Sequence, residues 1–337
     1  MICIPISGST NESMLALIAQ AEKEPADLYE YRFDCMDESP DVETLIKAAS
    51  RPVMATCRSV NEGGSFRGGF AERRSILRRA GFAGAAYIDS EASDLASLAE
   101  CGGAIRIISM HDFDATPVDL EYRISALSST PADWVKFAVT ARSYADNLTL
   151  FKALAKCTKP AIAIAMGEMG VVSRILGPRF GSRVTFGSLG TGLESAPGQT
   201  TATDLVELYR VRSITDKTRL LGYLGHPDHP ADGHLVHNRA FRNAGMDAVC
   251  IPFLARDAGD FLNSIPDGIG LCRLAVAPCH ERDALAWAAS ATPEARRNGG
   301  ANVLCRIDGH WVADHTVRPA TTESVVIRDM ELCRRAR

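Results

Sequence analysis

The chain has 337 residues, 46% of them hydrophobic and 23% charged, which is typical of a soluble globular protein and long enough for two domains. Its 37 Lys and Arg residues stand against 41 Asp and Glu residues, and the net charge of −4 gives no electrostatic reason to bind nucleic acid or an anionic membrane. No apolar run approaches the roughly 20 residues that span a bilayer, and the opening MICIPISGSTNESM lacks the pattern of a secretory signal, so we expect a cytoplasmic protein.

The first two-thirds of the chain alternate short apolar runs with amphipathic segments. The runs are β-branched or rich in small residues, as expected for parallel strands buried on both faces. They cover residues 2–7, 28–34, 53–58, 85–91, 106–113, 134–139, 161–167 and 184–189. Helical spacing appears between them, for example at 14–22, 72–79 and 145–156. This alternation predicts an α/β fold. Because there are eight such runs, we expect a (β/α)8 TIM barrel over residues 1–215.

The pattern changes from about residue 215. Apolar runs at 220–224, 248–253, 271–277 and 302–307 alternate with helical stretches at 235–244 and 281–289. The sequence therefore predicts a second, smaller α/β domain over residues 216–337. No Gly-rich dinucleotide turn follows residue 215, so we expect no Rossmann domain.

Charged residues stand at the ends of the predicted barrel strands. They are Glu30, Arg32 and Asp34 in the second strand, Arg58 after the third, His111 and Asp112 in the fifth and Lys136 in the sixth. The active site of a (β/α)8 barrel lies at the carboxyl ends of its strands, and a charge inside an apolar strand is costly without partners. We interpret these residues as one shared site. A structural ion pair within the second strand is the alternative.

Three side chains have chemistry suited to a carbonyl substrate. Lys136 lies in DWVKFAV, where burial would lower the pKa of its ammonium group and leave an amine able to attack a carbonyl; a lysine reaching the barrel rim is the alternative. His111, with an ordinary pKa of about 6.5, suits proton abstraction, although a lone histidine is more often a satisfied polar residue. Glu62 in RSVNEGG could orient an imidazole or simply belong to a polar turn.

The chain up to about residue 213 resembles type I 3-dehydroquinate dehydratases. The matching stretches are EYRFD (30–34), TCRSVNEGG (56–64), MHDFDATP (110–117), WVKFAV (134–139), GVVSRILGPRFGSRVTFGS (170–188) and SAPGQ (195–199). The last stretch belongs to a loop after the eighth predicted strand that could close over the site.

The resemblance implies a complete reaction. Lys136 would form an imine with the C3 carbonyl of 3-dehydroquinate, and no metal or diffusible cofactor would be needed. His111 would remove a C2 proton and then help the C1 hydroxyl leave as water, giving 3-dehydroshikimate, while Glu62 holds His111. Arg174 would bind the substrate carboxylate. Glu30, Arg32 and Arg58 would contact the ring hydroxyls. The closing loop would contribute Ser195 and Gln199.

Residues 220–253 and 299–311 resemble the substrate-binding domain of shikimate dehydrogenase, in the order found in bifunctional dehydratase–dehydrogenases. The positions of that family's two serines, asparagine, threonine, catalytic lysine and later aspartate fall at Ala231, Gly233, Leu274, Val276, His280 and Val317. We therefore expect no shikimate dehydrogenase activity. Three roles stay open for this domain: packing against the barrel, forming a homodimer, or binding a different ligand.

The sequence favours three other interpretations less. A zinc site among the histidines at 226, 229, 234 and 237 is disfavoured because His237 and Asn238 match a helix-borne pair of the dehydrogenase family. A non-catalytic sensor of quinate or shikimate intermediates would not need an imine-forming lysine. Another lysine-dependent barrel enzyme, such as an aldolase, would not need the ring-hydroxyl and carboxylate ligands.

Overall fold

The structure, a computed structural model, describes residues 1–94, 101–193, 199–228, 232–265 and 267–316. These residues form two compact units. The first unit comprises Met1–Arg142 and Thr149–Glu207, and the second comprises Ser143–Leu148 and the described residues from Leu208 onward. No helix in the described ranges is long and apolar enough to cross a membrane.

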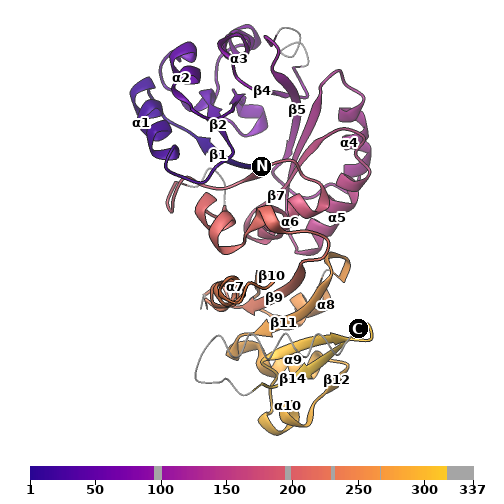
Figure 1. The fold of residues 1–337 in the computed structure, drawn as a ribbon. Helices are drawn as coiled ribbons and strands as arrows, with labels where there is room; N and C mark the ends of the chain where they lie inside the picture. The colour runs from indigo at the N-terminus through magenta and orange to yellow at the C-terminus, as the bar shows by residue number, and fades with distance from the viewer. Residues whose placement is uncertain (95–100, 194–198, 229–231, 266, 317–337) are drawn as a thin grey trace. The chain divides into compact units, whose positions relative to one another are not determined.

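Eight parallel strands form the sheet of the first unit, in the order β7-β6-β5-β4-β3-β2-β1-β8 (Figure 1). Their bounds are β1 Ile2–Ile6, β2 Leu28–Arg32, β3 Val53–Thr56, β4 Tyr87–Glu91, β5 Ile105–Asp112, β6 Trp134–Thr140, β7 Ala161–Met166 and β8 Thr185–Phe186. A bridge between Ala161 and Ser182 brings the two outer strands together, so the sheet curls into a nearly closed barrel. The predicted TIM barrel is confirmed.

Helices follow most of these strands and surround the barrel. They are α1 Asn11–Ala21, α2 Val42–Ala48, α3 Phe70–Ala83, α4 Leu120–Ser128, α5 Ala145–Ala155 and α6 Val171–Leu176. Helix α1 begins three residues before its predicted start because Thr10 forms a capping box with Ser13. The eighth strand is shorter than predicted because the chain leaves the barrel after Gly187, where Ser188 bridges to Thr201 instead.

The alternation of side chains along the strands explains where the polar site lies. Outward-facing residues, such as Val135 and Phe137, belong to an apolar cluster that includes residues of α4 and α5. Inward-facing Leu28, Met54, Tyr87 and Ile107 form part of a buried apolar layer inside the barrel. Two residues further along the same strands, the inward positions are Glu30, Thr56, Asp89 and Ser109. The polar layer therefore lies directly above an apolar floor, at the carboxyl ends of the strands.

The second unit contains a six-stranded mixed sheet in the order β10-β9-β11-β13-β14-β12. The strands are β9 Arg219–Gly225, β10 Ala248–Leu254, β11 Leu271–Val276, β12 Ser290–Ala291, β13 Val303–Ile307 and β14 His310–Asp314. The helices are α7 Gly233–Asn243, α8 Ala258–Asn263, α9 Glu281–Trp287 and α10 Pro293–Asn298. The four predicted strands are present, while the sequence analysis missed β12 and β14.

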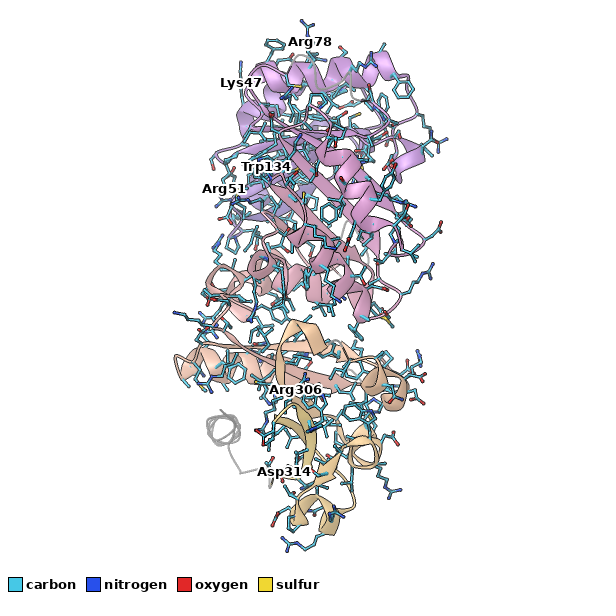
Figure 2. The ribbon with its side chains drawn as sticks, turned by 90° about the vertical axis from the view of Figure 1, so that its right-hand side faces the viewer. Lys47, Arg51, Arg78, Trp134, Arg306 and Asp314 are labelled. Atoms are coloured by element: carbon cyan, nitrogen blue, oxygen red, sulfur yellow. The ribbon has the colours of Figure 1, made fainter. Side chains whose placement is uncertain are left out.

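Strand β14 pairs with β13 in an antiparallel hairpin, whose strands carry the labelled Arg306 and Asp314 in Figure 2. The connection consists of Asp308 and Gly309, which both have positive φ angles, of 49° and 82°. Two central residues with positive φ match the right-handed twist of a two-residue hairpin.

Candidate active site

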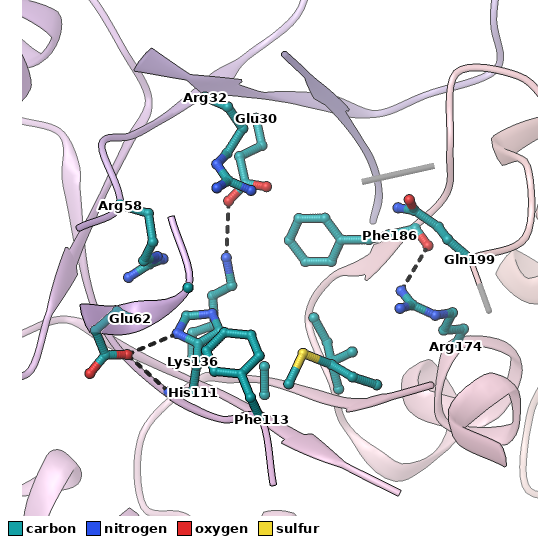
Figure 3. Close-up of a pocket in the computed structure, with 14 residues that line it drawn as sticks. Glu30, Arg32, Arg58, Glu62, His111, Phe113, Lys136, Arg174, Phe186 and Gln199 are labelled. Atoms are coloured by element: carbon teal, nitrogen blue, oxygen red, sulfur yellow. Dashed lines mark hydrogen bonds and ion pairs between the residues drawn. The ribbon is translucent and has the colours of Figure 1, made fainter. Parts of the chain in front are cut away.

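The carboxyl ends of the barrel strands surround a pocket of about 120 Å³ (Figure 3). Its lining includes all the described residues to which the family resemblance assigns a role: Glu30, Arg32, Arg58, Glu62, His111, Lys136, Arg174 and Gln199. Asp34 and Asp112, which were predicted to share the site, do not line the pocket. The predicted residue Ser195 lies outside the described residues. Gly63, Phe113, Met166 and Phe186 contribute further to the wall. Residues far apart in the sequence thus meet at one place, and their individual roles stay predictions.

The side chain of Lys136, on β6, lies between two carboxylates. Its Nζ donates to Asp89 Oδ2 at 2.8 Å and to Glu30 Oε1 at 3.0 Å, and the side chain lies beside the Phe186 ring. Burial disfavours the ammonium form, but the charges of Asp89 and Glu30 outweigh it, so the pKa of Lys136 is raised. The predicted lowering of this pKa is wrong. The lysine is held as an ammonium ion and must lose a proton before it can act as a nucleophile.

His111 and Glu62 form a pair across the pocket wall. One oxygen, Glu62 Oε2, lies 3.2 Å from both the backbone N and the ring Nδ1 of His111. A carboxylate at Nδ1 favours the tautomer with the proton on that nitrogen, which leaves the lone pair on Nε2. Burial, together with the positive charges of Arg58 and Lys136, lowers the pKa of His111 well below its ordinary value. The imidazole is therefore neutral near pH 7 and able to accept a proton.

Asp89, on β4, joins the lysine to an arginine. Asp89 Oδ2 also accepts from Arg58 Nη2 at 2.8 Å, and its other oxygen accepts from Ser109 Oγ at 2.6 Å. Burial disfavours the carboxylate, but Arg58 and Lys136 hold the pKa of Asp89 below its ordinary value. The sequence analysis missed Asp89 and Ser109. Asp89 carried the signal used for Glu30, a charge at the end of an apolar run.

Arg32 and Glu30 take different partners although they are two residues apart. Arg32 pairs with Asp34 through two bonds of 2.9 and 2.8 Å, so part of the structural alternative for the second strand is correct. Glu30 instead accepts from Lys136 and from Thr56 Oγ1. Arg32 keeps a place on the pocket wall while its charge is balanced by Asp34.

Arg174, on α6, is a buried cation with 3% of its surface exposed. Within the described ranges, its Nη1 donates to the carbonyl oxygen of Phe186, at 3.5 Å, and its Nε has no hydrogen-bond partner. No ion pair with a described carboxylate is formed, and burial lowers the pKa of Arg174 to about 10. An uncompensated buried charge is costly, so an anionic ligand in this pocket would be favourable.

In the second unit, the described residues that the resemblance aligns with polar groups of shikimate dehydrogenase pack or hydrogen-bond within the unit itself. Leu274 and Val276 are buried, and His280 Nε2 lies 3.0 Å from the carbonyl oxygen of Ala255. A Cβ at Gly233 would lie 2.1 Å from the Tyr223 ring, so that ring occupies the space of any larger side chain. The remaining predicted positions, Ala231, Val317 and the histidine at 229, lie outside the described residues. No cluster of three or more His, Cys, Asp or Glu side chains among the described residues is arranged to hold a metal ion.

Comparisons with known proteins agree with this architecture. The type I 3-dehydroquinase family model matches residues 2–216. A bifunctional 3-dehydroquinate dehydratase/shikimate dehydrogenase, chloroplastic, from Arabidopsis thaliana is 34% identical over 320 residues, covering 91% of this chain and 52% of its own length. A 3-dehydroquinate dehydratase from Dehalococcoides mccartyi is 37% identical over 217 residues, covering 61% of this chain and 96% of its own length.

A solved structure also resembles the chain across both units. The dehydroquinate dehydratase and shikimate dehydrogenase from S. pombe AroM aligns with a TM-score of 0.54 and 19% identity, covering 93% of this chain and 64% of that one. At this identity the likeness concerns the fold alone. The family match, the barrel and the pocket at its strand ends together show that the chain belongs to the type I 3-dehydroquinase family.

Proposed function

We propose that residues 1–215 dehydrate 3-dehydroquinate to 3-dehydroshikimate through an imine on Lys136. The observation that carries the proposal is one pocket lined by a buried lysine, a neutral histidine oriented by a glutamate, and a buried arginine without a carboxylate partner among the described residues. The names of the Arabidopsis and Dehalococcoides relatives support the choice of substrate. No observation gives the sensor or aldolase interpretations comparable support.

Charged and polar side chains of the pocket would hold the substrate. Arg174 would pair with the ring carboxylate, because a planar guanidinium can donate two parallel hydrogen bonds to a carboxylate. Gln199 and Ser195 would contact the substrate from the closing loop. Arg58, Arg32 and Glu30 would contact the ring hydroxyls. These contacts would place the C3 carbonyl beside Lys136.

The covalent step requires the neutral amine of Lys136. The ammonium gives up a proton, the nitrogen attacks C3, and the carbonyl oxygen leaves as water, which yields a protonated imine. Glu30 Oε1, 3.0 Å from Nζ, is placed to take that proton. The cationic imine is an electron sink, so the neighbouring C2 proton becomes more acidic.

His111 then serves two proton transfers. Its Nε2 removes the C2 proton, and the C2–H electrons move into the imine to form an enamine. The enamine electrons return to expel the C1 hydroxyl, which leaves as water after taking the proton from His111. Water finally hydrolyses the imine, releases the conjugated product and restores Lys136. The net change is the loss of one water molecule.

The test of this function is the appearance of the product. 3-Dehydroshikimate carries a carbon–carbon double bond conjugated with its ketone, so its formation raises ultraviolet absorbance. We expect the absorbance to rise when the purified protein is mixed with 3-dehydroquinate and no added cofactor. A flat trace at saturating substrate would refute the proposal.

For residues 216–337 we propose a shikimate dehydrogenase-like substrate-binding domain without dehydrogenase activity. Three groups that the resemblance expects to be polar are replaced by Gly233, Leu274 and Val276, and the first of these is closed off by Tyr223. A site built for polar groups loses much of its affinity when its hydrogen-bond partners are removed. The cytoplasmic location and the homodimer stay predictions.

A further inference from the structure

Glu91, at the end of β4, is bonded to Ser59, the residue that precedes the turn carrying Glu62. Its Oε1 accepts from the backbone N of Ser59 at 2.6 Å, and its Oε2 accepts from Ser59 Oγ at 2.9 Å. Glu91 is only 2% exposed and is not part of the pocket lining. The geometry points to Glu91 as a positioning residue that holds Glu62 against His111, an inference that rests on the proposed function.

The turn is organised around the residue that Glu91 holds. Ser59 precedes the short 3-10 helix Val60–Glu62, and its carbonyl oxygen accepts from Glu62 N at 3.1 Å and from Gly64 N at 2.8 Å. Ser59 is therefore bonded to Glu91 on one side and to the end of the turn on the other. A displacement of Ser59 would move Glu62, whose Oε2 contacts both the backbone and the ring of His111.

Gly63, at the end of the turn, lies against Phe113. Gly63 has a φ of +73°, and a Cβ there would lie 2.2 Å from the Phe113 ring. That ring lies parallel to the His111 ring, with centroids 5.8 Å apart. The turn is thus bonded to Glu91 through Ser59 and contacts Phe113 at Gly63, so we infer that a change at Glu91 reaches the Glu62–His111 pair.

The charge of Glu91 is balanced by Arg73, which does not line the pocket. Arg73, on α3, donates to Glu91 at 2.6 Å and to Asp94 at 3.2 Å, and Arg74 donates to Asp94 at 2.9 Å. Both Arg73 and Glu91 are almost fully buried. Within the part of the chain that the structure describes, the Asp94 carboxylate belongs to the same ion cluster and accepts from Arg73 and Arg74, not from the Glu62 turn. It therefore offers a matched control for the loss of a buried carboxylate.

The experiment is a double-mutant cycle with Glu62 in the full chain. Glu91→Gln should lower kcat by about 10- to 100-fold, because small misplacements of catalytic groups are costly. In a Glu62→Gln background the same change should cost less than about threefold, because Glu91 would act only through Glu62. Asp94→Asn should leave kcat within about twofold in the wild-type background. Equal losses from Glu91→Gln in both backgrounds would overturn the inference.

A milder variant and a second readout keep the test decisive. If Glu91→Gln does not fold, Ser59→Ala removes only the hydroxyl bond to Glu91 and should show the same dependence on Glu62, with a smaller loss. The ring signals of His111, assigned from their absence in His111→Ala, should shift in their NMR titration in Glu91→Gln or Ser59→Ala but not in Asp94→Asn. Unshifted signals would contradict the role of Glu91. This readout needs no turnover, so it is independent of the proposed function.

Discussion

Lys136 Nζ lies 2.8 Å from Asp89 Oδ2 inside the barrel, and the same carboxylate oxygen lies 2.8 Å from Arg58 Nη2. One buried anion therefore balances two cations that face the pocket. The arrangement keeps Lys136 protonated. The charge of Asp89 is the largest one that raises the pKa of Lys136, and so it sets the pH at which the amine becomes neutral and nucleophilic.

Asp89→Asn should move imine formation to lower pH. The charge of Asp89 raises the pKa of Lys136, so its removal lowers that pKa, and the unbalanced Arg58 acts in the same direction. Because the neutral amine fraction grows as pH rises through the pKa, the midpoint of the trapping rate should fall. The measurement is borohydride trapping against pH at fixed 3-dehydroquinate. Asp133→Asn, which removes an exposed partner of Arg106, is the control. An upward or absent shift would contradict the account.

His111→Ala should lose most turnover but still form the imine. Removal of a general acid–base group costs about 10²–10⁴-fold, and His111 serves two proton transfers, so we expect the upper end of that range in kcat. Steady-state rates and borohydride trapping, measured on the same preparation, separate the two steps. A loss of turnover below about tenfold would remove His111 from this role.

Arg174→Lys should raise KM by about 10- to 100-fold, because an ammonium cannot reproduce the paired hydrogen bonds of a guanidinium and such charged bonds are each worth about 1.5–3 kcal/mol. Arg183→Lys, at an exposed position after α6, is the matched control and should leave KM unchanged. If KM responds to the change at Arg183 and not to the change at Arg174, another arginine holds the carboxylate.

The protein should not oxidise shikimate. With shikimate and NADP present, nicotinamide absorbance should stay constant, because Gly233, Leu274 and Val276 cannot make the hydrogen bonds of the polar groups that they replace. His280, at the position of the family's catalytic lysine, contacts the carbonyl oxygen of Ala255. Steady reduction of NADP that disappears in His280→Ala would overturn this prediction.

Much of the barrel could be predicted because its strands are local patterns. Runs such as 134–139 are continuously apolar, and alternation alone puts Lys136 on the same face as Ala138, inside the barrel. The convergence of His111 and Lys136 followed from the rule that strand ends share one edge. Strand β14 was missed although Asp308-Gly309, between the runs 303–307 and 310–314, is a hairpin signal that could have located it.

The electrostatics of the site could not be predicted in the same way. The pKa of Lys136 depends on Asp89, which is 47 residues away in the chain and two strands away in the barrel. Burial alone would lower this pKa. The three-dimensional pairing shows that the charges of Asp89 and Glu30 raise it by more than burial lowers it. The support of Glu62 by Glu91 is equally non-local, because it links the loop after β3 to the end of β4.

The most direct test of the account is to trap the covalent intermediate. The purified protein is treated with borohydride in the presence of 3-dehydroquinate, and the intact mass and peptide map are recorded. We expect a stable adduct on Lys136 that is absent in Lys136→Ala and retained in Lys159→Ala, a lysine whose Nζ bonds to the backbone oxygens of Thr130 and Ala132. An adduct on another lysine, or near wild-type turnover in Lys136→Ala, would contradict imine catalysis at this residue.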